Sequence, residues 1–160
     1  MTRNNLPGKE VQVYTDGAAS GNPGRGGFGI VLKYKDHRKE LSQGYVLTTN
    51  NRMELLAVIV ALEQLKKEGC QVTVYTDSRY VSEAVNQGWL FGWERKDFKK
   101  KKNPDLWKRF LTVYRKHEVR IIWVKGHGNV TENERCDRLA VEAYRSGKLV
   151  TDDGYNSETP

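Results

Sequence analysis

The segments VYTDG, residues 13–17, and VYTDS, residues 74–78, are almost identical, and they decide how this chain is expected to fold. Each one lies at the end of a predicted β-strand. Ligands of open α/β sheets bind beyond the carboxyl ends of the strands, so we expect Asp16 and Asp77 to lie at one edge of one sheet. An aspartate in this position also forms turns or helix N-caps, but its recurrence in matching contexts favours a functional role.

The remaining pattern predicts an α/β fold. The predicted strands are Val11–Thr15, Phe28–Tyr34, Lys39–Leu47, Val72–Thr76 and Arg120–Val124. The predicted helices are 51–68, which Gly69 is expected to cap, 78–86, 104–116 and 131–145. The order βββαβααβα predicts a five-stranded mixed sheet flanked by helices, in which the first three strands are antiparallel and the later ones are added in parallel.

The composition is that of one globular domain. The chain has 160 residues, of which 38% are hydrophobic, and this is enough to bury a core. The longest apolar run, Leu55–Leu62, is far shorter than the roughly 20 residues of a membrane span. Cys70 and Cys136 are not in metal-ligand spacing and the first ten residues lack a secretory apolar stretch, so we expect a cytoplasmic protein with no membrane contact. The expected division is residues 1–10 as a flexible N-terminus, 11–146 as the domain and 147–160 as a flexible C-terminal tail.

Positive charge is concentrated in one segment of the chain. Residues 85–125 contain twelve Lys or Arg against four Asp or Glu and carry +8, whereas the whole chain carries +7. All four tryptophans lie in the same segment. Cations neutralise phosphates and aromatic faces stack on bases, so this combination favours nucleic acid over a membrane surface. The alternative is a solvated basic helix over core tryptophans, which we prefer for Trp107 and Trp123, whereas we expect Trp89 and Trp93 to bind.

Two further carboxylates lie in line with apolar residues on predicted helices. The residues four and eight positions after Glu54 are apolar, so Glu54 lies on the apolar stripe of its predicted helix. Asp137 lies on a similar apolar stripe. Glu54 could instead be the capping-box partner of Asn51. A bare cluster of Asp16, Glu54, Asp77 and Asp137 would be strongly self-repelling, and a hard divalent cation, for which Mg²⁺ is the best fit, would relieve that repulsion.

Two loops near this edge carry further candidates. His127 lies between glycines in KGHGN, directly after the last predicted strand, and its spacing leaves proton shuttling and a surface role equally open. The stretch GNPGRGGFG, residues 21–29, lacks the Gly-Lys-Ser/Thr ending of a phosphate-binding loop. We interpret it first as a β-turn whose backbone could approach a ligand closely.

Taken together, five motifs closely resemble the bacterial-type ribonuclease H family, ribonuclease HI. They run in order from about Val11 to Tyr144: YTDG with GNPGRGGFG, TTNNRMEL at 48–55, TDSRYV at 76–81, WVKGH at 123–127 and ENERCDRLA at 132–140. The resemblance implies a ribonuclease H-like fold and endonucleolytic cleavage of the RNA strand of RNA/DNA hybrids. It also implies that cleavage has little sequence preference and leaves 5′-phosphate and 3′-hydroxyl products.

The resemblance also implies the residues of the site. The implied catalytic residues are Asp16, Glu54, Asp77, His127 and Asp137, and the four carboxylates would hold two Mg²⁺ ions, with Mn²⁺ as a substitute. The implied hybrid contacts are Asn22, Asn50 and Asn51, with Thr49 and Asn103 forming a pocket for a DNA-strand phosphate. Trp89, Trp93, Lys99, Lys100, Lys101 and Lys102 match a basic protrusion at about residues 86–103. The expected partner is an RNA/DNA hybrid, and we expect a monomer with no obligate protein partner.

Two positions depart from the family pattern. Leu47 stands where relatives often carry an arginine near the phosphate pocket, and Phe98 stands where they often carry a third tryptophan. We therefore expect binding to depend more on charge and less on stacking. Two rival functions remain to be weighed at this stage, namely a DNA-cutting nuclease that shares the fold and a hybrid-binding module without catalysis. The presence of all four carboxylates and the histidine argues against the second.

Overall fold

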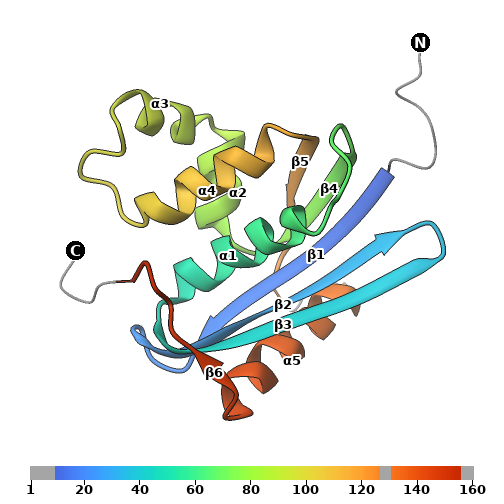
Figure 1. The fold of residues 1–160 in the computed structure, drawn as a ribbon, viewed down its shortest axis with the longest axis vertical. Helices are drawn as coiled ribbons and strands as arrows, with labels where there is room; N and C mark the ends of the chain where they lie inside the picture. Colours follow the sequence, from blue (N-terminus) through green and yellow to red (C-terminus); the bar gives the residue numbers. More distant parts are fainter. Residues whose placement is uncertain (1–9, 127–130, 156–160) are drawn as a thin grey trace.

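The computed structural model of this chain describes residues 10–126 and 131–155. The sheet that these residues form has six strands in the order β5-β4-β1-β2-β3-β6 (Figure 1). The strands are β1 (Glu10–Ala19), β2 (Gly24–Tyr34), β3 (His37–Thr48), β4 (Gln71–Thr76), β5 (Glu118–Trp123) and β6 (Leu149–Val150). β1, β2 and β3 are antiparallel, whereas β4 is parallel to β1, β5 to β4 and β6 to β3. The predicted mixed sheet with an antiparallel start is confirmed, with six strands rather than five.

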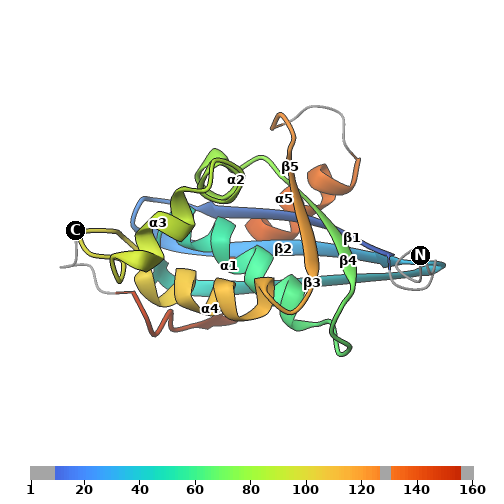
Figure 2. The same cartoon turned by 90° about the horizontal axis from the view of Figure 1, so that it is seen from above.

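Helices cover both faces of this sheet. They are α1 (Asn50–Glu63), α2 (Arg79–Asn86), α3 (Trp89–Arg95), α4 (Pro104–Tyr114) and α5 (Thr131–Arg145). Figure 1 shows α5 on one side of the three long strands and α1 to α4 on the other. In Figure 2, β4 and β5 cross the long strands at a steep angle, as the right-handed twist of a sheet requires. None of the helices in the described residues is long and apolar enough to span a membrane.

The core is built around α1, which is apolar on almost every side. Met53, Leu55, Val58 and Ile59 are fully buried, and they point to different sides of the helix. A helix that is apolar all round must be covered all round, and here the sheet lies against one side and α4 against another. The polar side chains of Arg52 and Glu54, which lie among these apolar residues, are therefore carried into the interior of the protein.

The helix α1 ends earlier than the predicted helix, residues 51–68. α1 ends at Glu63, and the backbone N–H of Gln64 donates to the carbonyl oxygens of Val60 and Ala61 at 3.2 Å. Gly69, expected as the C-cap, lies instead in the connection to β4 with a φ of +80°. The polar residues 66–68 carry no apolar stripe for a further helical turn to bury, so the helix stops.

The short helix α3 and the start of β2 also differ from expectation. α3 has only seven residues, with apolar side chains on several sides, so no helical period is visible in its sequence. It follows Gly88, whose φ of +79° separates it from α2. β2 also begins earlier than the predicted strand Phe28–Tyr34, because residues 24–27, expected within a β-turn, form its first four residues.

The fold extends beyond residue 146, where the sequence analysis ends the domain. Leu149 and Val150 pair with Gly44 and Tyr45 of β3, and Asp152 is only 8% exposed. Residues 147–155 contain too few apolar residues to show the pattern of a strand. The segment is held instead by polar contacts with residues far away in the sequence, which no local pattern reveals. The expectations for residues 1–9 and 156–160 lie outside the described residues.

The packing of α5 on β2 predicts the effect of an added methyl group. A Cβ at Gly29 would overlap the carbonyl oxygen of Cys136 and lie 2.7 Å from the Leu139 Cβ. We expect Gly29→Ala to lower the free energy of unfolding by about 1–3 kcal/mol, because overpacking forces α5 away from the sheet. Urea unfolding followed by circular dichroism measures this change.

Gly92→Ala is the matched control. A Cβ at Gly92 in α3 would meet only the Arg95 guanidinium, at 3.7 Å. Since alanine favours a helix over glycine by up to about 1 kcal/mol, this variant should be neutral or more stable than the parent. An equal loss in both variants would contradict the close packing of α5 on β2.

Candidate active site

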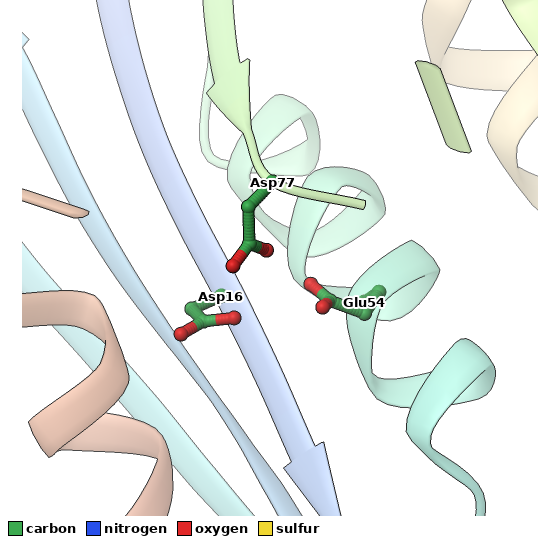
Figure 3. A group of neighbouring side chains, drawn as sticks. All are labelled: Asp16, Glu54 and Asp77. Atoms are coloured by element: carbon green, nitrogen blue, oxygen red, sulfur yellow. The ribbon is translucent and has the colours of Figure 1, made fainter. Parts of the chain in front are cut away.

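Three carboxylates from three separate elements meet at one point. Asp16 lies on β1, Glu54 on α1, and Asp77 directly follows β4. One carboxylate oxygen from each lies within 4.8 Å of the others, and Figure 3 shows the three side chains turned toward a common centre. The structure therefore brings together three of the four carboxylates that the sequence analysis assigned to a metal site.

The sheet opens at this point. The pairing of β1 with β4 ends at Tyr14 and Tyr75, whereas β1 continues to pair with β2 as far as Ala19. Asp16 is thus within β1 rather than at its end, contrary to expectation, but it lies just past the last pair with β4. The opening leaves room between the two strands for the side chains of Asp16 and Asp77.

Asp77 and Glu54 do not fill the capping roles considered as alternatives. Ser78 is the N-cap of α2, because its Oγ accepts a hydrogen bond from the Val81 backbone N–H at 3.1 Å. Thr49 is the N-cap of α1. The carboxylates are therefore not needed to end or begin a helix.

Glu54 is held against β1 through Gly17. The Gly17 backbone N–H donates to Glu54 Oε1 at 3.0 Å and to Asp16 Oδ1 at 2.9 Å. A Cβ at residue 17 would overlap the backbone of Met53 and Glu54, so only glycine permits this approach of α1 to β1. The side chain of Glu54 is 6% exposed and faces the other two carboxylates.

The protonation of this cluster reflects burial and mutual repulsion. Burial, followed by the charges of Asp77 and Asp137, raises the pKa of Asp16 to about 8. Burial and the charges of Asp16 and Asp77 likewise raise the pKa of Glu54 well above its ordinary value. Both carboxyl groups would therefore release their protons to solvent when a divalent cation binds, because its charge would favour the ionised carboxylates.

Asp137 joins the cluster from α5. It lines a cavity of about 220 Å³ together with Asp16, Glu54 and Asp77, and its charge contributes to the raised pKa of Asp16. The close group of three oxygens does not include Asp137, so it lies at the rim of the ligand set. Hard carboxylate oxygens are the donors that Mg²⁺ and Mn²⁺ prefer, and the donor set of this cavity fits such an ion. His127 lies outside the described residues.

Asn133 is a site residue that the sequence analysis missed. Its Nδ2 donates to the carbonyl oxygens of Thr15 at 3.4 Å and of Tyr75 at 3.2 Å, and it lines the same cavity. It thereby bridges β1 and β4 where their ladder opens. The signal was its spacing, since Asn133 precedes Asp137 by four residues and so lies on the same face of α5.

Five of the eleven predicted hybrid contacts line a second cavity. This cavity has a volume of about 430 Å³ and is lined by Asn22, Thr49, Asn51, Arg52, Lys102, Asn103, Pro104 and other residues. Asn50 lies instead on the carboxylate cavity, and its backbone N–H donates to Asn22 Oδ1 at 3.1 Å. The loop between β1 and β2 and the start of α1 therefore connect the two cavities.

The tryptophans do not divide as expected. Trp107 is fully buried, as predicted, but Trp123 is 38% exposed and its indole N–H donates to the carbonyl oxygen of Asp77 at 3.0 Å. The prediction of a core role for Trp123 is wrong, because β5 is an edge strand and one of its faces is open to solvent. Trp89 is 50% exposed, whereas Trp93 packs edge-on against Trp107 with ring centroids 5.8 Å apart.

The lysine run beside these tryptophans is exposed. Lys99, Lys100, Lys101 and Lys102 form the connection between α3 and α4, and the Lys101 ammonium lies 5.1 Å from the centre of the Trp93 ring. Phe98 is 5% exposed, so this ring serves the core and is not available for stacking. The surface of this region therefore offers charge together with one exposed indole, that of Trp89.

Comparison with known sequences gives a consistent result. The sequence model of the RNase H family matches residues 8–145. A "Ribonuclease H" of Syntrophus aciditrophicus (strain SB) is 53% identical over 93% of this chain and 88% of the relative. A "Ribonuclease HI" of Synechocystis sp. is 52% identical over 91% of this chain and 94% of the relative. Each relative is matched over most of its length.

Solved structures show the same architecture. LC9-RNase H1, described as a type 1 RNase H with the type 2 active-site motif, superposes with a TM-score of 0.79 and is 30% identical over 94% of this chain and 80% of that chain. LC11-RNase H1, solved in complex with an RNA/DNA hybrid, has a TM-score of 0.65 and is 27% identical over 85% of this chain and 97% of that chain. The overall fold of this chain is therefore similar to the folds of these two proteins.

The raised pKa of Asp16 predicts how pH changes stability. The pKa of Asp16 is about 8 in the folded protein and 3.8 ordinarily, so the folded protein binds this proton more tightly than the unfolded chain does. The stabilisation from the protonated carboxyl group is therefore complete below about pH 4, and the free energy of unfolding falls as the pH rises toward 8. In EDTA near pH 8.5, we expect Asp16→Asn to have a free energy of unfolding on the order of 2 kcal/mol higher than that of the parent. Urea unfolding at several pH values measures this difference.

Two further measurements complete this prediction. The difference between parent and Asp16→Asn should shrink toward zero near pH 4, where the carboxyl group is protonated in both folded and unfolded chains. Mg²⁺ should then stabilise the parent more than the variant, because it binds the folded cluster. Equal stabilities of the two proteins across the pH range would show that Asp16 is not held in a repulsive, buried environment.

Proposed function

Because this chain belongs to the ribonuclease H family, we propose that it is a metal-dependent endonuclease that hydrolyses the RNA strand of RNA/DNA hybrids. The observation that carries this proposal is the convergence of Asp16, Glu54 and Asp77 within a cavity where the pairing of β1 with β4 ends. The exposed basic segment and the hybrid-bound relative LC11-RNase H1 support a nucleic-acid substrate. The products are a 5′-phosphate and a 3′-hydroxyl.

The carboxylates are assigned to holding Mg²⁺, with Mn²⁺ as a substitute. When bound, two such ions supply an activated water and stabilise the leaving 3′ oxygen. Asp16 and Asp77 face each other across the strand opening, and Glu54 closes the third side from α1. Asp137 is assigned to complete the set from α5, because it lines the same cavity as the other three carboxylates.

His127 is assigned to moving a proton at this site. In the sequence it follows Gly126, which lines the carboxylate cavity. An imidazole is the side chain whose ordinary pKa lies nearest neutrality, so it can both take up and release a proton there. Its role is to assist turnover and product departure rather than to hold metal.

Hybrid recognition is assigned to three groups of residues. Asn22, Asn50 and Asn51 are assigned to the groove, Thr49 and Asn103 to a phosphate of the DNA strand, and Trp89, Trp93 and Lys99 to Lys102 to the flank of the hybrid. Contacts of this kind go to backbone and sugar, so they read little base sequence. RNA is distinguished from DNA by its 2′-hydroxyl groups in the shallow minor groove. We further propose that the protein acts in the cytoplasm as a monomer without an obligate partner.

Asp77→Asn should abolish cleavage while leaving hybrid affinity within about twofold of the parent. The amide retains the shape of the side chain but no longer holds the metal charge, so turnover should fall on the order of 10³-fold or more. Cleavage of a labelled hybrid in Mg²⁺ measures turnover, and the affinity is measured separately by fluorescence anisotropy.

Asp36→Asn, at the exposed turn between β2 and β3, is the control for the loss of one negative charge and should cleave like the parent. Duplex DNA of the same sequence should remain uncut by every protein. Near-normal turnover of Asp77→Asn would remove this carboxylate from the site, and equal cleavage of duplex DNA would favour a DNA-cutting nuclease.

Changing all four lysines at residues 99–102 to glutamine should weaken hybrid binding and flatten its dependence on salt. Each lost phosphate contact lowers the slope of log affinity against log salt by about one. At saturating hybrid the cleavage rate should stay near that of the parent, because these side chains lie on a separate connection from the carboxylates. Affinity titrations across a range of salt concentrations measure the slope.

The matched control changes Lys35, Lys39, Lys66 and Lys67 to glutamine. These four lysines are also exposed, so the control loses the same net charge from the β2–β3 turn, the start of β3 and the connection between α1 and β4. Its slope should stay close to that of the parent. If both variants lose slope equally, the segment 99–102 acts only through the overall charge of the protein.

A further inference from the structure

Arg52 lies at the centre of a buried network that reaches the last described residues of the chain. Only 2% of this side chain is exposed. Its Nε and Nη2 donate to Asp152 at 2.7 and 3.0 Å, and its Nη1 and Nη2 donate to Asp105 at 2.9 and 2.7 Å. Asp152 also accepts a hydrogen bond from Thr48 Oγ1 at 2.7 Å. Arg52 is thus shared between α4 and the C-terminal segment, residues 149–155.

The fifth hydrogen bond of Arg52 goes to Asn103. Arg52 Nη1 donates to Asn103 Oδ1 at 3.2 Å, while Asn103 Nδ2 donates to the Tyr80 hydroxyl at 2.9 Å. Trp107 Nε1 donates to the same hydroxyl at 2.9 Å and fixes its position. The Asn103 amide is therefore held at both ends, and its Nδ2 carries a second hydrogen for a ligand.

The C-terminal segment closes over this network and reaches the same cavity. A Cβ at Gly154 would overlap the Asp105 carboxylate and lie 2.9 Å from Arg52 Nη2, so the chain passes directly over this ion pair. The Tyr155 backbone N–H donates to the Asp152 carbonyl oxygen at 3.0 Å. Gly154 and Tyr155 line the 430 Å³ cavity together with Thr49 and Asn103.

Arg52 itself is not free to hold a phosphate. Five of its hydrogen bonds are made to protein oxygens, and its charge is offset by two carboxylates. Leu47, at the position where relatives often carry an arginine, is 43% exposed and offers no charge. Lys102 also lines this cavity, but it is exposed, whereas the Asn103 amide is fixed, and its orientation decides whether it meets a phosphate oxygen.

We propose that the C-terminal segment, residues 149–155, is a positioning element of the substrate site, because Asp152 holds Arg52 and Arg52 orients Asn103 toward a phosphate of the DNA strand. This inference rests on the proposed function. A purely structural tether would change stability alone, whereas a positioning element also changes how strongly the enzyme depends on one phosphate of the DNA strand.

The test uses hybrids in which a single uncharged methylphosphonate replaces one DNA-strand phosphate, scanned position by position. For the parent, one position should raise KM by about tenfold, the effect of losing one charge-assisted hydrogen bond, with little change in kcat. In Asp152→Asn the penalty at that position should fall to about two- or threefold, because Asn103 no longer discriminates the two linkages. Asp153→Asn loses the same charge from an exposed neighbouring residue and should keep the penalty of the parent.

A second variant guards against unfolding of Asp152→Asn, which leaves Arg52 with one carboxylate partner. Gly154→Ala keeps Asp152 but forces the segment away from the Arg52 and Asp105 pair, so it should lose the same discrimination. All proteins are assayed below the onset of unfolding seen by circular dichroism. A full tenfold penalty in whichever of these variants folds would overturn the inference.

Two further outcomes separate the inference from the proposed function. If the parent cleaves the hybrid but no position is sensitive, the DNA-phosphate pocket and this inference both fall, while the proposed function stands. If the parent does not cleave the RNA strand of any hybrid, the proposed function fails and takes the inference with it.

Discussion

The close approach of α1 to β1 at Gly17 is the contact on which the rest of the site depends. One backbone N–H at this position donates to both Asp16 and Glu54, and no side chain could be accommodated there. Bringing two carboxylates together in a buried place is unfavourable, and the apolar burial of α1 on nearly every side supplies the opposing free energy. The functional cluster is therefore maintained by the core rather than by its own interactions.

Two pairs of carboxylates in this protein have opposite pKa shifts. A hydrogen bond from an arginine lowers the pKa of Glu40 to about 2, and the same is true of Glu132. Asp16 and Glu54, whose largest influences are burial and neighbouring carboxylates, are shifted upward. The first group fastens α5 to the β2–β3 hairpin, so its charges are used within the fold. In the second group, burial and the repulsion between carboxylates are not offset by an arginine, and this distinguishes a ligand site from a structural ion pair.

The sequence predicts those parts of the molecule that follow a local period. The long strands and the helices α4 and α5 have such periods, whereas α1 is indicated by its long apolar run. Glu54 and Asp137 were found because they lie in line with apolar residues. β6 and the role of Arg52 could not be found in this way. Arg52 meets partners 53 and 100 residues later, and a charged residue near a helix start is ordinarily solvated. Trp123 was misplaced because an apolar edge strand has the same pattern whether its outer face is covered or open.

The two cavities are joined by a short, well-fastened piece of backbone. Asn50, which lines the carboxylate cavity, donates its N–H to Asn22, which lines the second cavity, and Thr49 between them caps α1. The distance between the cavities is thus set by the start of a buried helix and cannot vary freely. Under the proposed function one cavity receives the RNA strand and the other a DNA-strand phosphate. A fixed separation then selects duplexes by groove width, so recognition of the hybrid's shape follows from the same helix that places Glu54.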